Sequence, residues 1–95
     1  MTFTAVFELK ENEEVLPNQY RSTCIEKGLE HHFSLSLWEP QYRFLSNLVY
    51  DDVADHFVYL FRDREMSDWT FYYNMMILHM YFKDSHDAVY ARLLV

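Results

Sequence analysis

The stretch from Trp69 to Phe82, WTFYYNMMILHMYF, runs for fourteen residues without a charged side chain. It contains six aromatic residues, three methionines and one histidine. A membrane-spanning helix needs about 20 predominantly apolar residues, so this run is too short to cross a bilayer. The run instead predicts a buried strand, because both of its alternating sets of residues are largely apolar.

The two halves of this predicted strand differ in polarity. Residues 75–82 are apolar on both faces, which is typical of a central strand that is covered on both sides. In residues 69–74, Thr70, Tyr72 and Asn74 share one face, so we expect this half to be partly uncovered and to contact a partner. A helix is the alternative, because five residues also form a helical stripe: Trp69, Tyr72, Tyr73, Met76 and Met80.

Alternation of side-chain character predicts two more strands, over residues 3–10 and 31–38. Between them, Pro17 predicts the first turn of a helix, where its missing N–H costs nothing. Gly28 predicts the end of that helix, because glycine readily adopts the left-handed conformation that closes a helix.

Residues 40–62 predict two helical pieces with a break near Tyr50 and Asp51, since apolar residues recur there every three or four positions. Asp52 is the expected N-cap of the second piece. A hairpin with Phe57, Tyr59 and Phe61 on one face is the alternative. Near the end of the chain, Asp84 predicts the N-cap of a last helix.

These elements predict a single compact α+β domain over residues 1–95. The expected order is strand, helix, strand, one or two helices, strand and helix. We expect a small sheet of three or more strands, with the helices packed mainly on one of its faces.

Composition limits where the protein works and what it binds. Fifteen acidic and eight basic residues give a formal net charge of −7. This charge argues against direct binding of nucleic acid, which requires a basic surface. The single cysteine, Cys24, cannot form an intrachain disulfide, and the first residues lack the pattern of a signal peptide. We therefore expect a cytoplasmic protein that does not interact with a membrane.

The sequence contains no glycine-rich phosphate loop, nucleophile elbow or zinc-ligand spacing. We therefore expect no enzymatic activity, no cofactor and no metal. Asp52 and His56 form the strongest contrary pattern, because a carboxylate and an imidazole four residues apart on a helix can hold a divalent metal. A small metal-dependent or acid–base enzyme centred on Asp52, His56 and His79 is the alternative function.

Two features indicate protein binding instead. Acidic residues cluster where they could meet a basic protein surface: Glu11, Glu13, Glu14, Asp51, Asp52 and Asp55. The chain also has eight tyrosines, eight phenylalanines and two tryptophans, more than we expect so short a chain to bury. Trp38, Trp69 and Tyr72 are the expected anchors of a partner, because such residues are enriched at interface centres.

In size, acidity and lack of catalytic motifs, the chain is similar in type to phage-encoded inhibitors of host defence enzymes, such as anti-CRISPR and anti-restriction proteins. The resemblance implies a non-enzymatic protein that occludes a basic surface of its partner, and mimicry of DNA on a nucleic-acid-binding enzyme is one form of this hypothesis. A structural homodimer is a third reading, in which the predicted third strand pairs edge to edge with a second copy.

Overall fold

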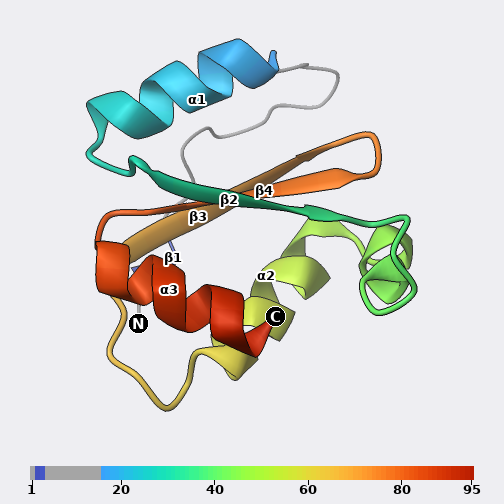
Figure 1. Ribbon diagram of the computed structural model, residues 1–95. Helices are drawn as coiled ribbons and strands as arrows, with labels where there is room; N and C mark the ends of the chain where they lie inside the picture. Colours follow the sequence, from blue (N-terminus) through green and yellow to red (C-terminus); the bar gives the residue numbers. More distant parts are fainter. Residues whose placement is uncertain (1, 4–15) are drawn as a thin grey trace.

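A four-stranded sheet organises residues 2–3 and 16–95, the part of the chain that the computed structural model describes (Figure 1). Its strands are β1 (Thr2–Phe3), β2 (His31–Ser36), β3 (Asp68–Asn74) and β4 (Ile77–Phe82). They lie in the order β1-β3-β4-β2, so β2 forms one edge. β1 runs parallel to β3, whereas β4 is antiparallel to both β3 and β2. The predicted strand over residues 3–10 lies outside the described residues beyond Phe3.

The run from Trp69 to Phe82 is a hairpin, so the prediction of one long strand is wrong, as is the helical alternative. Asn74 pairs with Ile77, and the turn consists of Met75 and Met76. Met75 has a φ of 58°, in the left-handed region that non-glycine residues rarely adopt. Such a turn lets the chain reverse direction within two residues.

Because of the turn, alternate residues that share one face of the sheet in β3 lie on the opposite face in β4. Tyr73 pairs with Leu78 and Phe71 with Met80, so odd-numbered residues of β3 share a face with even-numbered residues of β4. One face therefore carries the fully buried apolar residues: Trp69, Phe71, Leu78, Met80 and Phe82. The other face carries Thr70, Tyr72, Ile77, His79 and Tyr81.

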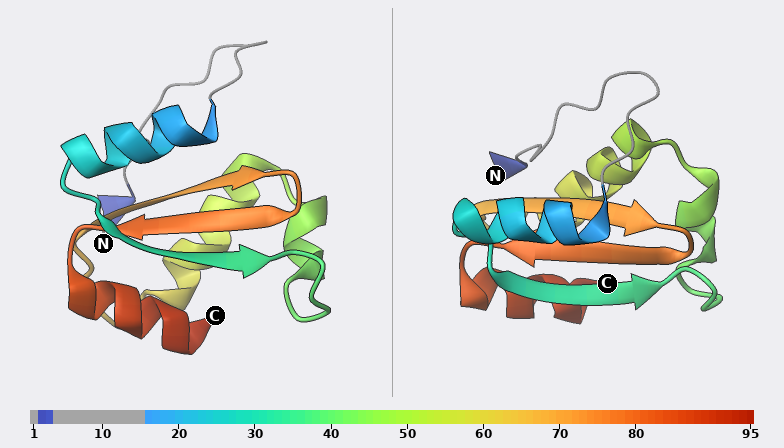
Figure 2. Two further views of the ribbon diagram at one scale, coloured as in Figure 1. Left: turned by 45° about the horizontal axis from the view of Figure 1, so that its top comes forward. Right: turned by 90° about the horizontal axis from the view of Figure 1, so that it is seen from above.

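Two helices cover the more apolar face of the sheet (Figures 1 and 2). α2 (Tyr50–Leu60) contributes Val53 and Phe57, and α3 (Ser85–Leu94) contributes Ala91. These residues join the buried side chains of β2, β3 and β4 in one hydrophobic cluster. The rings of Phe57 and Trp69 meet edge to face at 6.4 Å, a geometry that aromatic pairs favour.

A single helix, α1 (Pro17–Glu26), covers part of the opposite face (Figure 2). Tyr20 and Cys24 of this helix pack with Leu29 and Tyr81 in a second, smaller cluster. The Tyr20 hydroxyl lies 2.8 Å from the Thr70 hydroxyl and donates to the Phe71 carbonyl at 2.8 Å. α1 therefore adheres to the sheet through a tyrosine whose polar tip is satisfied inside the protein.

The α+β class is confirmed, with two of the three α-helices on one face. Gly28 ends α1 as predicted: its φ is 81°, and the Leu29 N–H donates to the Cys24 carbonyl at 2.8 Å. Residues 40–62 form two helical pieces, a 3₁₀ helix (Arg43–Asn47) and α2, so the hairpin alternative there is wrong. Within the described residues, no helix has the length and apolar content needed to cross a bilayer.

Of the two predicted N-caps, one is formed and one is not. Asp84 caps α3, because its side chain accepts hydrogen bonds from the backbone of His86 at 2.7 Å and Asp87 at 3.2 Å. Asp52 does not cap α2, which begins after Val49 without a side-chain cap. Asp51 and Asp52 instead lie in the first turn, where the helix dipole favours negative charge.

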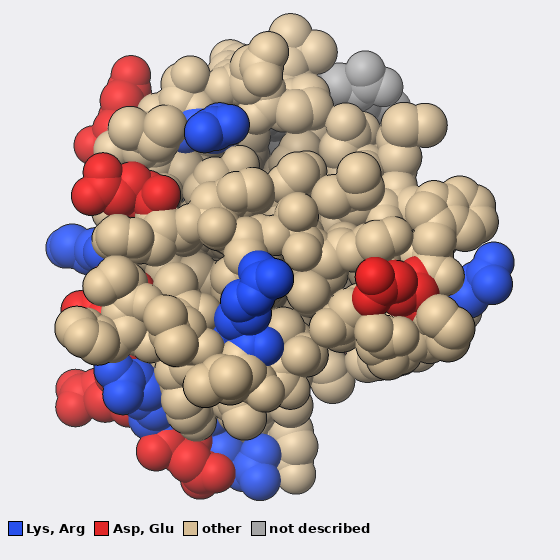
Figure 3. Space-filling view, viewed as in Figure 1, with Lys and Arg blue, Asp and Glu red and all other residues tan. Residues whose placement is uncertain are grey.

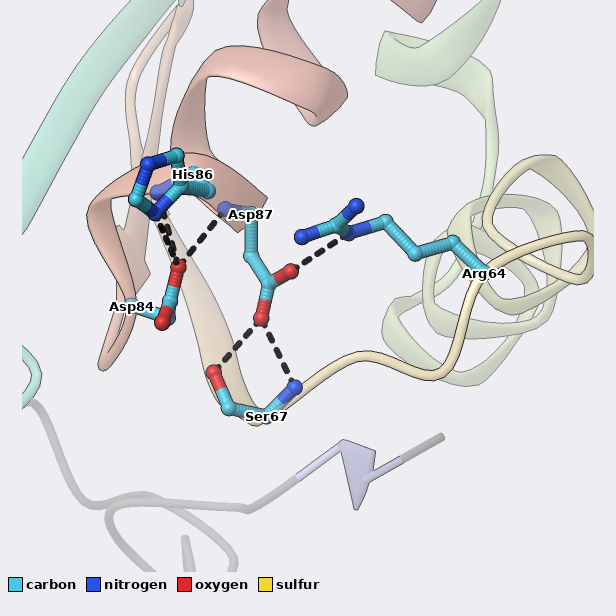
Figure 4. A network of polar contacts seen from close by, with 5 residues as sticks. All are labelled: Arg64, Ser67, Asp84, His86 and Asp87. Carbon is cyan, nitrogen blue, oxygen red and sulfur yellow. Dashed lines mark hydrogen bonds and ion pairs between the residues drawn. The ribbon is translucent and has the colours of Figure 1, made fainter.

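Asp87 ties α3 to the segment that follows α2 (Figure 4). Its carboxylate accepts hydrogen bonds from Arg64 Nε at 2.7 Å and from the Ser67 N–H and hydroxyl at 2.8 and 2.6 Å. Burial raises the pKa of Asp87, but the hydrogen bonds from Ser67 and Arg64 outweigh it and hold the pKa below its usual value. Stability from this contact is present above the unfolded-state pKa and is lost as the pH falls through the lower folded value.

Replacing Tyr20 with phenylalanine should lower the free energy of unfolding by about 1–3 kcal/mol, because the buried Thr70 hydroxyl loses its partner while the ring packing is kept. Denaturant unfolding of the Tyr20→Phe variant measures this loss. Tyr59→Phe is the matched control, since Tyr59 is exposed on α2. Equal destabilisation by the two variants would contradict the role of the Tyr20 hydroxyl in holding α1.

Candidate functional site

An exposed apolar surface lies at the turn between β3 and β4, beside the end of β2. The Leu37 N–H donates to the Met76 carbonyl at 2.7 Å, which holds the turn against the chain leaving β2. The surrounding side chains enclose a shallow hollow of about 350 Å³. We name this surface the hairpin-tip patch; it comprises Ser34, Ser36, Trp38, Met75, Met76 and Ile77.

The hairpin-tip patch carries no charge, although the protein as a whole is strongly acidic. Its largest side chains are well exposed: 88% for Met75, 64% for Trp38 and 45% for Ile77. Exposed apolar residues that are grouped in this way, with polar residues beside them, are typical of binding surfaces. The Arg43 guanidinium lies 5.7 Å from the centre of the Trp38 ring and supports one side of it.

Met75 is the least expected residue of the patch. A side chain larger than that of glycine or asparagine is disfavoured at positive φ, and a solvent-exposed methionine gains little from burial in return. The prediction of one long strand places Met75 and Ile77 in the core, which is wrong. Asn74 is the one residue of the run that favours turns, and it is the signal that could have revealed the hairpin.

The expected partner anchors lie in three different environments. Trp38 is exposed, as expected. Tyr72 is half-buried, and its ring stacks on Tyr20 at 4.5 Å. Trp69 is fully buried among Phe57, Phe61 and the rest of the core, so its assignment to a partner surface is wrong. The error follows from the missed turn, because Trp69 lies at the base of the hairpin, inside the core, and the exposed part of the run is the tip.

On the face shown in Figure 3, the acidic residues do not form one continuous surface. Asp51, Asp52 and Asp55 are exposed together at the start of α2. On the face shown in Figure 3, acidic groups are scattered and several lie beside basic groups. Glu11, Glu13 and Glu14 lie outside the described residues, so their position relative to α2 remains a prediction.

The residues of the alternative enzyme site are divided between the two faces of the sheet. Asp52 and His56 belong to α2, which packs on the more apolar face. His79 belongs to the opposite face, because it pairs with Tyr72 across the hairpin. The sheet therefore separates His79 from the other two, and the three residues cannot act on one substrate. Among the described residues, no group of three or more metal-binding side chains comes together.

His56 lines a second hollow, of about 420 Å³, between the 3₁₀ helix, α2 and the end of α3. The lining is mostly apolar and includes Phe44, whose ring meets the imidazole edge to face at 5.1 Å. Burial lowers the pKa of His56, so this side chain is neutral near pH 7. Among the described residues, His56 has no carboxylate partner that would make it a general base.

His79 has a partner that the sequence did not reveal. His32 Nε2 lies 3.0 Å from His79 Nδ1, and the two rings lie nearly parallel with their centres 5.2 Å apart. The His32 ring also stacks on Tyr81 at 4.7 Å. A hydrogen bond between two imidazoles requires that one of them accept, so at least one ring of the pair is neutral. The pairing of β2 with β4 creates this contact, which no short-range sequence pattern encodes.

Both histidines of this pair resist protonation. Burial lowers the pKa of His32, with further contributions from His79 and Arg21, and burial also lowers the pKa of His79. Two imidazoles and a phenol ring thus give this part of the sheet an uncharged surface above pH 7. The arrangement binds protons weakly, and no further residue of the described part joins it as the third ligand that a structural metal site requires.

Comparisons with protein-family models, with curated proteins and with solved structures found no match for this chain. The fold and the surfaces therefore define it only as a small acidic α+β protein with an exposed, uncharged hairpin tip.

Acidification should destabilise the fold through the histidine pair. A folded-state pKa below the unfolded value of about 6.5 means that the unfolded chain binds more protons, so stability is present above that pH and is lost as the pH falls through the folded values. Unfolding free energies measured from pH 8 to pH 5 should decline less steeply in the His32→Gln/His79→Gln double variant. Leu93→Gln, at an exposed position of α3 that carries no titratable group, should keep the slope of the parent. Identical slopes for all three proteins would contradict this assignment.

Proposed function

We propose that this protein is a non-enzymatic binding module that acts by covering part of the surface of a partner protein, in the manner of a small inhibitor. The observation that carries the proposal is the hairpin-tip patch, in which Met75 and Ile77 of the hairpin and Trp38, which follows β2, are exposed to solvent. Tryptophan and methionine are enriched at the centres of protein interfaces, where they contribute large contact areas.

The conformation of Met75 supports a binding role for the tip. Holding a non-glycine residue in the left-handed region costs about 1–2 kcal/mol. A glycine or asparagine would occupy the same position with less strain, and the fold gains nothing visible from the methionine. A strained residue on a surface is a reason to consider function, and here the exposed thioether is available to a partner.

Charge supports a partner with a basic surface. The net charge of −7 and the exposed group of Asp51, Asp52 and Asp55 would attract such a partner over a distance and raise the rate of encounter. A nucleic-acid-binding enzyme has a basic surface of this kind, and a host defence enzyme that phage proteins inhibit is an example. The uncharged hairpin tip would then supply the close contact, because ion pairs that stay exposed to solvent contribute little to the free energy of binding.

Capture of partners from a lysate of the native host tests the proposal. Immobilised parent protein should retain a specific protein, and Trp38→Ala should reduce its recovery by at least about tenfold, as expected for an interface anchor. Ile25→Ala is the control, because Ile25 is an exposed apolar residue of α1 outside the patch. Retention that falls between low and physiological salt would support electrostatic attraction, and equal recovery by both variants would contradict the role of the tip.

Replacing Met75 with asparagine should change stability and binding in opposite directions. Asparagine tolerates positive φ, so Met75→Asn should raise the free energy of unfolding by up to about 1 kcal/mol. The same variant should retain less partner than the parent in the capture experiment. A gain in stability together with a loss of binding cannot result from misfolding. Undiminished binding would show that Met75 has no part in the interface.

A further inference from the structure

The outer edge of β2 is open along its length. The Leu37 N–H bonds to Met76, and backbone groups of a strand alternate between its two sides, so His31, Phe33 and Leu35 direct theirs toward β4. The N–H and C=O of His32 and Ser34 therefore point away from the sheet. No backbone group among residues 2–3 and 16–95 pairs with these outward groups.

Natural edge strands are usually protected against pairing with another chain by a charged residue, a proline or a bulge. β2 has none of these devices, since its sequence is HHFSLS and it keeps an unbroken register with β4. A binding partner can use an unprotected edge, because an extended segment of the partner can form hydrogen bonds with the outward backbone groups of β2.

α3 packs beneath β2 (Figure 1), and two hollows along the strand form a groove beside this edge. A hollow of about 380 Å³ lies beside the first half of the strand, and one of about 200 Å³ lies beside the second half. The first is lined on the helical side by Ser85, Ala88 and Val89. The exposed Val89 gives the groove an apolar wall that could receive a side chain from an added strand.

Arg92 lies at the junction of the two hollows and lines both of them, together with Glu30 in the first and Glu39 in the second. Its guanidinium is 5.7 Å from the centre of the Phe33 ring, so the side chain lies along the strand. No carboxylate of the described residues lies within ion-pairing distance of Arg92. A guanidinium in this position matches a carboxylate in geometry and charge.

We propose that the groove between β2 and α3 binds an extended segment of a partner protein, which adds to β2 as a further strand and places an aspartate or glutamate on Arg92. Backbone hydrogen bonds to His32 and Ser34 supply the affinity, and the pockets beside Val89 and Arg92 select the side chains. This site shares Ser34 with the hairpin-tip patch but differs from it in mode of binding, because the patch uses exposed side chains and the groove uses the backbone edge and α3.

A second copy of the chain is a poorer occupant than such a segment. Pairing of two β2 strands would place the two Arg92 side chains near one another, and β2 itself carries no carboxylate that could pair with them. The long-range field also opposes association of two chains that each carry a charge of −7. An acidic side chain in an added peptide satisfies Arg92, which a second copy of β2 does not.

Two synthetic peptides test the selection of charge: acetyl-STVEVTS-amide and acetyl-STVKVTS-amide. The full-length protein should bind the glutamate peptide about fivefold more tightly than the lysine peptide, as measured by isothermal titration or NMR titration. Non-specific attraction to an acidic protein would give the opposite order. Arg92→Glu should reverse the preference, and a preference of the parent protein for the lysine peptide would overturn the proposal.

A proline and an alanine at one position test the strand addition. Ser34→Pro removes the outward N–H, and proline is tolerated where the N–H of an edge strand faces solvent. It should weaken binding of the glutamate peptide by at least about tenfold, whereas Ser34→Ala, which loses the same hydroxyl, should bind like the parent. In the parent, the peptide should slow hydrogen exchange at the amides of His32 and Ser34.

Three results would overturn the proposal. Equal binding by Ser34→Pro and Ser34→Ala would exclude strand addition, and so would peptide-induced protection that omits His32 and Ser34. Sedimentation showing that the parent is a dimer and Ser34→Pro a monomer would assign the edge to a second copy. Loss of host-protein capture in Trp38→Ala with unchanged peptide binding would separate this site from the hairpin-tip patch, so the two proposals can fail independently.

Discussion

The two-residue turn between Asn74 and Ile77 determines the arrangement of the remaining structure. It sets the register of β3 against β4, and a register shift of one residue would move every side chain of the second strand to the other face. With the register as it is, Trp69, Phe71 and Met80 meet the core side chains of α2 and α3. The same register places Thr70 and Tyr81 beneath Tyr20, so both layers of the fold depend on it.

The surfaces follow from the same constraint. Because α1 is short, it covers only part of its face, and the far end of the hairpin extends beyond it with Met75 and Ile77 exposed (Figure 2). The exit of β2 brings Trp38 to this end through the contact of Leu37 with Met76. The edge of β2 and its groove lie on the side of the sheet away from β1. The described part of the chain thus presents two surfaces of different character, an uncharged hairpin tip and an open strand edge beside Arg92.

The sequence predicts much of the fold because many of its signals are local. Pro17, Gly28 and Asp84 mark helix ends through their own backbone or side-chain chemistry, and the alternation of His31–Ser36 reports a half-buried strand. The turn at Met75 gives almost no local signal, since it lacks glycine and interrupts a run that is apolar on both faces. That one missed turn explains the wrong faces of the run, the buried Trp69 and the exposed Met75.

The candidate sites were harder to predict because they depend on pairing between distant strands. His32 and His79 are 47 residues apart and meet only through the register of β2 with β4. Arg92 becomes notable only when α3 lies beneath an open edge. Trp38 could be predicted as exposed because it lies at the end of a predicted strand, directly before Glu39 and Pro40. The exposure of its neighbour Met75 could not be predicted.

Proton NMR of the hairpin tests this account most directly. In the register described here, Phe71 and Met80 form a directly opposed pair, so a strong nuclear Overhauser effect should connect their Hα protons. A connection from the Hα proton of Phe71 to that of His79 or Tyr81 would mean a different turn and an exchange of faces in β4. A pattern of sequential helical contacts through residues 69–82 would contradict the hairpin altogether.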